Sequence, residues 1–289
     1  MKQSAYPYYP GCTLKASAKE YDISARLVCA QMGIKLEELD DWVCCGAASA
    51  HGIDRLLSIA LPARELVTAQ KFKAPLVTAC ALCFSRFKFA AYELRNEAMR
   101  NLIKYIIGEG EIQQNSDGVI HLIQLLDNNK DDIRVKKLLN GLRVACYYGC
   151  LLVRPKEVTN FDDEEEPQIM DKLIKLVEAE TVDWKFKTEC CGGSHMLTRP
   201  DIVIKLSHRL LYQAKQAGAD CLAVACPVCH YNLDSNQKKI EANYKDNIGL
   251  PVFYFTQLVG LAMELSPKQL LLNKHFVNPM PLLQRKGLI

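Results

Sequence analysis

One arrangement of cysteines occurs twice along this chain of 289 residues and accounts for ten of its 13 cysteines. The first copy begins with a Gly-Cys pair that ends at Cys12. After 31 residues follows the vicinal pair Cys44-Cys45 with Gly46, and after 34 more follows Cys80-Ala-Leu-Cys83. Thiols separated by so much chain act together only if the fold brings them to one place.

The second copy repeats this order. A Gly-Cys pair ends at Cys150, the vicinal pair Cys190-Cys191 with Gly192 follows after 39 residues, and Cys226-Pro-Val-Cys229 follows after 34 more. The common order and the equal 34-residue gap indicate an internal duplication. Any fold for this chain therefore has to present two equivalent groups of five thiols.

The sequence around the two CxxC motifs predicts an α/β fold. Short apolar runs at 76–80 and 222–226 have strand character, and each ends on the first cysteine of a CxxC. Helical patterns precede these runs at 58–71, with Pro62 near the start, and at 201–216, and they follow at 84–95 and 230–241. We expect two pseudo-symmetric α/β lobes, each with a small parallel sheet and one cysteine motif beyond the carboxyl ends of its strands.

The lobes are expected to divide near residue 140. The segments 108–118 and 127–132 are polar or charged, and an apolar run at 142–146 opens the second half as 5–9 opens the first. This predicts a first domain at 1–140 and a second at 141–289, packed against each other. The last stretch, 274–289, is apolar and interrupted by prolines, so it is predicted to form no stable helix. It would fray, or dock in a groove of this chain or of a partner.

Composition and charge exclude several classes of protein. Hydrophobic residues make up 49% and charged residues 24%, which is typical of a globular chain. The net charge of +3 gives no basic surface for nucleic acid. The longest apolar stretch, 250–265, is short and contains Pro251, so we expect no membrane span. An odd number of cysteines and the absence of a secretory signal disfavour a disulfide scaffold and favour a reducing, cytoplasmic location.

Five thiols per motif point to iron and sulfur more than to zinc. Structural zinc takes four ligands, and a cubane cluster also needs only four cysteines. A vicinal Cys-Cys pair does not readily place both sulfurs on one tetrahedral ion, but it can direct them to different irons of a cluster. The pattern favours an iron–sulfur assembly larger or more open than a cubane, with structural zinc as the alternative.

The duplicated pattern with its CCG triplets resembles the cysteine-rich domains of the heterodisulfide reductase B subunit and its relatives, over nearly the whole chain. The resemblance implies that each complete motif carries one noncubane [4Fe-4S] cluster. The first set of ligands would be Cys12, Cys44, Cys45, Cys80 and Cys83, and the second set would be Cys150, Cys190, Cys191, Cys226 and Cys229. The two clusters would face each other between the lobes.

The same resemblance implies a catalytic subunit of a heterodisulfide-reductase-like complex, which reversibly cleaves a disulfide held between its two clusters. Two partners would deliver the electrons, namely the iron–sulfur subunit and the flavin subunit of such a complex. The chain has no GxGxxG motif, so no flavin or nicotinamide site is expected in it. The segment CCGAASAHG and the apolar tail are closer to bacterial-type relatives. The substrate would be a small-molecule disulfide or thiol, or a sulfur-carrier protein.

A second function stays open. Domains with the CCG pattern also serve as non-catalytic electron-transfer or anchoring modules in complexes of the succinate or glycerol-3-phosphate dehydrogenase type. A catalytic subunit needs a proton donor for the departing thiolate, and His51 and His195 each follow a vicinal cysteine pair closely enough to be candidates. Capping of the next helix, or simple exposure to solvent, is the structural interpretation of both.

Residues outside the ten ligands are expected to be structural. Cys29, Cys146 and Cys221 lie in apolar segments and are interpreted as core thiols, although Cys146 is close enough to Cys150 to be an alternative ligand. Tyrosines precede the first cysteine of each set, at positions 8–9 and 147–148. They would pack in the sheet or line a substrate cleft.

Overall fold

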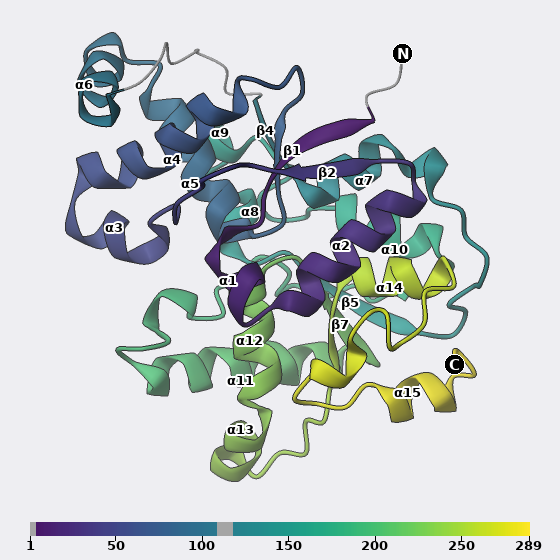
Figure 1. The fold of residues 1–289 in the computed structure, drawn as a ribbon. Helices are drawn as coiled ribbons and strands as arrows, with labels where there is room; N and C mark the ends of the chain where they lie inside the picture. The colour runs from purple at the N-terminus through teal and green to yellow at the C-terminus, as the bar shows by residue number, and fades with distance from the viewer. Residues whose placement is uncertain (1–3, 109–117) are drawn as a thin grey trace.

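The computed structural model describes residues 4–108 and 118–289 and contains two four-stranded parallel sheets (Figure 1). The first has the order β2-β1-β3-β4 and the second the order β6-β5-β7-β8, so the strand order is the same in both. Their bounds are β1 (Ala5–Tyr9), β2 (Lys35–Glu38), β3 (Leu76–Thr78), β4 (Val119–His121), β5 (Arg143–Tyr147), β6 (Glu180–Thr181), β7 (Cys221–Val224) and β8 (Val252–Tyr254). The predicted pair of α/β lobes with parallel sheets is confirmed.

Helices cover both sheets and connect their parallel strands, as crossover connections require. In the first half they are α1 (Gly11–Ala16), α2 (Lys19–Gln31), α3 (Ala47–Ile53), α4 (Arg55–Ala69), α5 (Ala81–Glu93), α6 (Glu97–Ile107), α7 (Leu122–Asn128) and the short η1 (Lys130–Asp132). In the second half they are α8 (Cys150–Val153), α9 (Lys156–Thr159), α10 (Ile169–Leu176), η2 (Gly193–His195), α11 (Pro200–Gln216), α12 (Pro227–Ser235), α13 (Gln237–Tyr244), α14 (Phe255–Ala262), η3 (Leu272–Lys274) and α15 (Met280–Arg285).

Three of the four predicted helices begin three residues before their predicted starts, namely α4 at Arg55, α5 at Ala81 and α12 at Pro227. Helix α4 begins three residues before the predicted start because the Asp54 carboxylate accepts a hydrogen bond from the Leu57 N–H at 2.6 Å and caps it. Pro62 therefore lies inside α4 and not near its start. The single helix predicted at 230–241 is two helices, α12 and α13, which meet at Asn236.

The lobes pack through pairs of helices that repeat the internal symmetry. Helix α2 of the first half packs on α14 of the second, and α7 of the first half packs on α10 of the second. In the first pair the buried hydroxyls of Ser24 and Thr256 lie 2.7 Å apart and share a hydrogen bond, and Tyr21 stacks on Tyr254 with ring centroids 4.1 Å apart. One continuous hydrophobic core contains residues of both halves, so the predicted packing of lobe on lobe is confirmed.

The C-terminal segment docks on its own chain, and the expectation that it holds no stable helix is wrong for α15. Pro279 is the N-cap of α15 and Pro281 lies in its first turn, where a missing N–H removes no intrahelical hydrogen bond. The leucines at 282 and 283 are buried, and the Lys286 ammonium donates to the Gly141 carbonyl at 2.7 Å. Prolines that would break the middle of a helix here help to start one.

A buried polar group fastens the start of this tail to α12. The Asp234 carboxylate accepts hydrogen bonds from the N–H groups of Phe276 and Val277, at 2.7 and 3.1 Å. Nearby, His230 bonds through Nε2 to the Val252 carbonyl at 2.9 Å, and His275 contacts the Gln257 amide at 2.9 Å. Ligand-type atoms of His230, Asp234 and His275 lie within 4.8 Å of one another, and each of the three side chains holds a partner of its own.

Candidate functional site

Both CxxC motifs lie where a strand of the central sheet ends and a helix begins. Cys80 follows β3 as the N-cap of α5, and Cys226 follows β7 as the N-cap of α12. Cys83 and Cys229 come three residues later, one turn up the same helix face. Since the carboxyl ends of parallel strands share one edge of a sheet, each CxxC is placed at the edge where α/β proteins bind their ligands.

The Gly-Cys pairs reach the same edge from the neighbouring strand. Cys12 lies in the first turn of α1 after β1, and Cys150 begins α8 after β5. A Cβ atom on the preceding glycine would come within 3.2 Å of the Cys83 sulfur at Gly11, and within 3.3 Å of the Cys229 sulfur at Gly149. Any side chain there would occupy the space beside the sulfurs, so glycine keeps that space open.

The vicinal pairs stand on loops that are held by buried tyrosines. The Tyr9 hydroxyl donates to the Val43 carbonyl and accepts from the Cys45 N–H, both at 2.9 Å. In the second lobe the Tyr147 hydroxyl donates to the Glu189 carbonyl at 2.7 Å, at the residue before Cys190. Tyr9 and Tyr147 are almost fully buried, so they hold the loops of the vicinal pairs from the side of the core. The sequence pattern does not reveal this role, although each tyrosine lies three residues before the first cysteine of its set.

The glycine after each vicinal pair turns the chain away from the sulfurs. Gly46 has φ of 80° and Gly192 has φ of 82°, in the left-handed region that residues with a side chain rarely adopt. At Gly192 the backbone N–H also donates to the Cys190 sulfur at 3.2 Å. The CCG triplet is thus a local requirement of the loop, since the turn needs glycine and the turn directs the thiols.

Within each set the sulfurs approach one another. In the first set Cys12 and Cys44 have sulfurs 3.9 Å apart, and Cys45 and Cys83 have sulfurs 3.3 Å apart. In the second set the sulfurs of Cys191 and Cys229 are 3.4 Å apart. The burial of the vicinal pairs also repeats, because the first member is exposed and the second is buried in both sets. The structure therefore brings together each predicted set.

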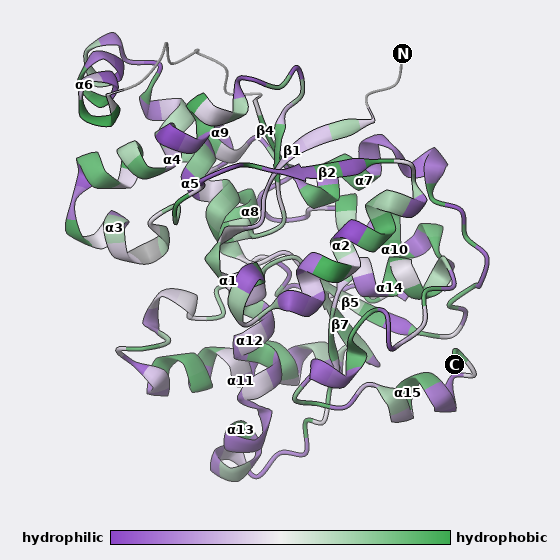
Figure 2. Ribbon diagram, viewed as in Figure 1, coloured by the Kyte–Doolittle hydropathy of each residue, from purple (hydrophilic) through white to green (hydrophobic). Residues whose placement is uncertain are grey.

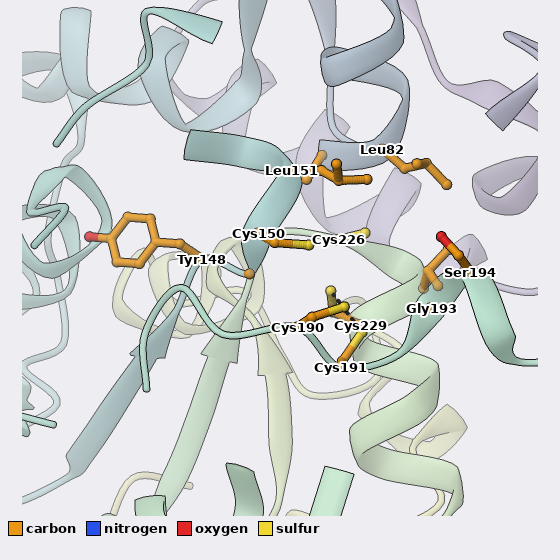
Figure 3. Close-up of a pocket in the computed structure, with 13 residues that line it drawn as sticks. Leu82, Tyr148, Cys150, Leu151, Cys190, Cys191, Gly193, Ser194, Cys226 and Cys229 are labelled. Atoms are coloured by element: carbon orange, nitrogen blue, oxygen red, sulfur yellow. Dashed lines mark hydrogen bonds between the residues drawn. The ribbon is translucent and has the colours of Figure 1, made fainter. Parts of the chain in front are cut away.

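All five thiols of the second set line one small cavity of about 50 Å³ (Figure 3). Cys150 and Cys226 lie on one side of it and Cys190, Cys191 and Cys229 on the other, while Leu82 and Leu151 form an apolar wall. Leu82 belongs to α5 of the other half, so both lobes enclose this cavity. An apolar wall beside converging thiols limits access of water to whatever the thiols bind.

The two sets meet at the lobe interface. Cys226 lines the cavity together with Ala81 and Leu82, which follow Cys80 in the other half of the chain, and the thiols of Cys80 and Cys226 are close enough to shift each other's pKa. The Tyr21 hydroxyl closes the interface beside them by donating to the Ala225 carbonyl at 3.4 Å. Nothing in the spacing of the cysteines predicts this contact, because it depends on how α5 packs on α8 and α1 on α12.

Electrostatics favour the thiolate at one member of each vicinal pair. The pKa of the Cys45 thiol is well below its ordinary value because of hydrogen bonds from Cys44 and from Cys83. The pKa of Cys190 is lowered first by a hydrogen bond with Cys150, then by the N–H groups of Gly192 and Gly193, and by the charge of His195. Thiolates are the form of cysteine that binds metal, so each set contains a thiol that already favours this form, whereas neighbouring thiols and burial raise the pKa of Cys12 and of Cys150.

The two candidate histidines lie in different surroundings. His195 ends η2 and is exposed, and it is close enough to influence the charge on Cys190. His51 is also exposed, but it packs edge-on against Phe89 with ring centroids 5.5 Å apart. Partial burial and the nearby charge of Arg86 lower the pKa of His51. Of the two, His195 is the one whose charge acts on a cysteine of its set.

The three cysteines outside both sets are fully buried, as expected of core thiols. Cys29 lies within α2, Cys146 within β5 and Cys221 at the start of β7. Burial raises the pKa of the Cys146 thiol well above its ordinary value, and Cys146 does not belong to the cysteines that line the cavity of the second set, whereas Cys150 does. Cys146 therefore remains with the core and does not act as an alternative to Cys150.

The donor sets suit an iron–sulfur group. Each set supplies five thiols at one sheet edge, more than a tetrahedral zinc ion takes. Glycines stand where a Cβ would approach the sulfurs, and the Asn232 amide adds a donor at 3.5 Å from the Cys191 sulfur. N–H donors directed at sulfur are the usual outer contacts of iron–sulfur clusters.

The family model for a cysteine-rich domain, CCG, matches two parts of this chain, residues 6–88 and 144–234. The 8-methylmenaquinol:fumarate reductase membrane anchor subunit of Wolinella succinogenes is 29% identical over 96% of this chain and 98% of its own length. The B subunit of the ferredoxin/F(420)H(2)-dependent CoB-CoM heterodisulfide reductase of Methanosarcina acetivorans is 27% identical over 91% of this chain and 90% of its own length.

One solved structure shares the fold. A hypothetical protein from Helicobacter pylori superposes with a TM-score of 0.75 at 14% identity, over 96% of this chain and 53% of that protein. The chain thus spans about half the length of that protein. In the described part of the chain, no helix combines the length and apolar character needed to cross a membrane.

Proposed function

The chain belongs to the family defined by the cysteine-rich CCG domain, and we propose that it is the subunit of a heterodisulfide-reductase-like complex that reversibly cleaves a disulfide between two noncubane [4Fe-4S] clusters. Each set of five cysteines would hold one cluster. The observation that carries the proposal is the arrangement of the sets, which are both complete and meet at Cys80 and Cys226 across the lobe interface. Two metal centres so placed can act on one substrate.

The reaction needs two electrons and two protons for each disulfide and yields two thiols. Iron–sulfur clusters transfer single electrons, so one on each side of the S–S bond would supply the pair without release of a thiyl radical. The residues of the chain have the remaining tasks. Leu82 and Leu151 exclude water from the site, and the tyrosine-held loops fix the ligands. His195 is proposed to hold a proton for the departing thiolate.

The electrons are proposed to come from partner subunits, because the chain offers no nucleotide motif of its own. An iron–sulfur subunit and a flavin subunit would serve, as in the complexes to which the chain is similar. All 13 cysteines are free thiols, which suits a reducing compartment, and we propose the cytoplasm. The disulfide would belong to a small molecule or to a sulfur-carrier protein.

Replacing His195 by glutamine should slow disulfide cleavage about tenfold near neutral pH, since a general acid contributes at least that much. His51→Gln is the matched variant and should leave the rate within about twofold, because His51 packs on Phe89 and its pKa is lowered. Initial rates with a chemical electron donor would be compared for the two variants. Equal rates for His195→Gln and the unchanged chain would remove His195 from the proposal.

A second candidate is a non-catalytic anchoring or electron-transfer subunit of a fumarate reductase or succinate dehydrogenase type of complex. The anchor subunit of Wolinella succinogenes, similar over 98% of its length, favours it. So does α6, which projects at the edge of the molecule and carries both strongly hydrophobic and strongly hydrophilic residues (Figures 1 and 2). On it, Leu102, Tyr105 and Ile106 are exposed, with Tyr105 86% exposed. An apolar face of this kind can lie in a membrane interface.

The two candidates give opposite results in one pair of measurements on the iron-loaded protein. If the main proposal holds, adding a disulfide to the reduced protein changes the electron paramagnetic resonance spectrum of its clusters, and adding buffer does not. If the protein is an anchor, the disulfide has no effect and the protein instead sediments with vesicles of phosphatidylethanolamine and phosphatidylglycerol. In that case Tyr105→Glu should release the protein from the vesicles. Leu138→Glu, at an exposed leucine outside α6, should not.

A further inference from the structure

Two equivalent positions, one in each lobe, carry different side chains beside the sulfurs. Arg86 lies three residues after Cys83 on α5, and Asn232 lies three residues after Cys229 on α12. Residues three apart share a helix face, so both side chains project on the side of the vicinal pair. The duplication gives the lobes the same ligands but not the same neighbours.

Arg86 is a buried cation that pairs with no carboxylate in the described part of the chain. It is 8% exposed, and its Nε and Nη1 atoms have no hydrogen-bond partner among the described residues. The groups whose charge acts on it are the thiols of Cys45 and Cys83. A buried charge without a partner is unfavourable, so the fold keeps Arg86 here only if something negative faces it. As ligands of the proposed cluster, Cys45 and Cys83 would be thiolates and would supply that negative charge.

Asn232 occupies the equivalent place in the second lobe and is neutral. It is fully buried, and its amide nitrogen donates to the Cys191 carbonyl at 3.2 Å and approaches the Cys191 sulfur at 3.5 Å. Cys191 corresponds to Cys45 in the first copy. The first lobe therefore places a full positive charge where the second places a dipole. An electron adds negative charge to a centre, and a nearby cation stabilises that added charge more than a dipole does.

We propose that Arg86 makes the two metal centres unequal, so that the centre held by the first set is reduced at a higher potential than the centre held by the second. Arg86 acts as a positioning residue, because it is buried and the groups that attract its charge are the ligand thiols of Cys45 and Cys83. The inference rests on the proposed clusters. It adds an order to the electron transfer, in which an arriving electron resides first in the first lobe and the second lobe is the stronger reductant.

The test is a potentiometric titration of chains that hold one centre each. Cys191→Ser leaves the first centre and Cys45→Ser leaves the second. In the Cys191→Ser chain, Arg86→Gln should lower the ratio of reduced to oxidised centre at least tenfold at fixed potential, which is about 59 mV for a one-electron couple. Arg86→Lys should restore most of the ratio because it keeps the charge. Arg95→Gln removes an exposed arginine and should change nothing.

The possible outcomes distinguish a failure of this inference from a failure of the proposed function on which it rests. In the Cys45→Ser chain, Arg86→Gln should leave the titration of the second centre unchanged. If Arg86→Gln left the reduction potential of the first centre unchanged, or shifted the potentials of both centres equally, the role of Arg86 would be overturned. The proposed clusters would not be affected by that result. If Arg86→Gln lost iron from the first set alone, Arg86 would have a role in cluster assembly and the proposed effect on the potential would also be overturned. If the glutamine variant does not fold, Arg86→Met repeats the test. Chains without iron–sulfur absorption would overturn the proposed function itself.

Discussion

Replacing Cys191 by serine should remove half of the iron, from about eight atoms per chain to about four. Cys191 is 4% exposed and its sulfur lies 3.4 Å from that of Cys229, so it supplies the buried member of the vicinal pair in the second set. Serine has nearly the same volume, so the fold should survive while the metal is lost. Iron and acid-labile sulfide, measured together on the anaerobically purified variant, check the result.

Cys146→Ser is the matched control for this experiment. Cys146 is fully buried and lies only four residues before Cys150, but it does not line the cavity of the second set. The Cys146→Ser variant should keep the full iron content. Loss of iron in Cys146→Ser, or full iron in Cys191→Ser, would show that the second set of thiols is not the metal site.

Losing either centre should abolish disulfide cleavage rather than halve it. We expect Cys45→Ser and Cys191→Ser each to reduce the rate by at least about 100-fold, because one remaining cluster supplies one electron and breaking the S–S bond needs two. Because Cys80 and Cys226 lie together at the lobe interface, the two proposed centres would form one site, and neither lobe would contain all of it. Steady-state rates with an excess of an artificial electron donor would measure the effect.

Partial activity of the single-cluster variants would contradict this expectation. If each single-cluster variant kept about half of the activity, the lobes would be working independently and the contact between them would have no catalytic meaning. A relay subunit gives a third pattern, in which the isolated chain cleaves no disulfide even with both clusters present. The iron content of every variant has to be known before its rate is compared, since an empty chain is inactive under any account.

The grouping of the cysteines and the parallel sheets can be predicted from the sequence because both follow from the repeated pattern. Apolar runs that end on a CxxC indicate where the strands stop, and the repeated 34-residue gap indicates that both lobes are built alike. The helical tail escapes prediction for a local reason. Pro279 and Pro281 have the pattern of helix breakers, whereas at the first turn of α15 they cost no hydrogen bond.

Other parts of the site depend on packing between distant segments, which spacing does not contain. Tyr9 and Tyr147 are visible in the sequence as tyrosines beside a Gly-Cys pair, but their partners are loop carbonyls 34 and 42 residues away. Arg86 is one of many basic residues until its burial against Cys45 and Cys83 is known. Sequence places a residue on an element, and only the assembled lobes decide what that residue faces.

The chain is similar to proteins of two kinds of complex, and both proposed functions assign it iron–sulfur clusters. The fumarate reductase anchor and the heterodisulfide reductase relative each match more than nine-tenths of this chain. What distinguishes the two functions is whether a disulfide is the substrate, and the cysteine sets alone do not encode it. Both proposed functions rest on the requirement that each set of five thiols holds iron and sulfide.

The most direct test of that requirement is anaerobic quantification of iron, zinc and acid-labile sulfide in the unmodified chain, with electron paramagnetic resonance of the same sample. The account predicts about eight irons and a similar amount of sulfide per chain, with signals from two distinct centres. About one zinc per lobe with little iron or sulfide would contradict it, because the sets would then be structural zinc sites.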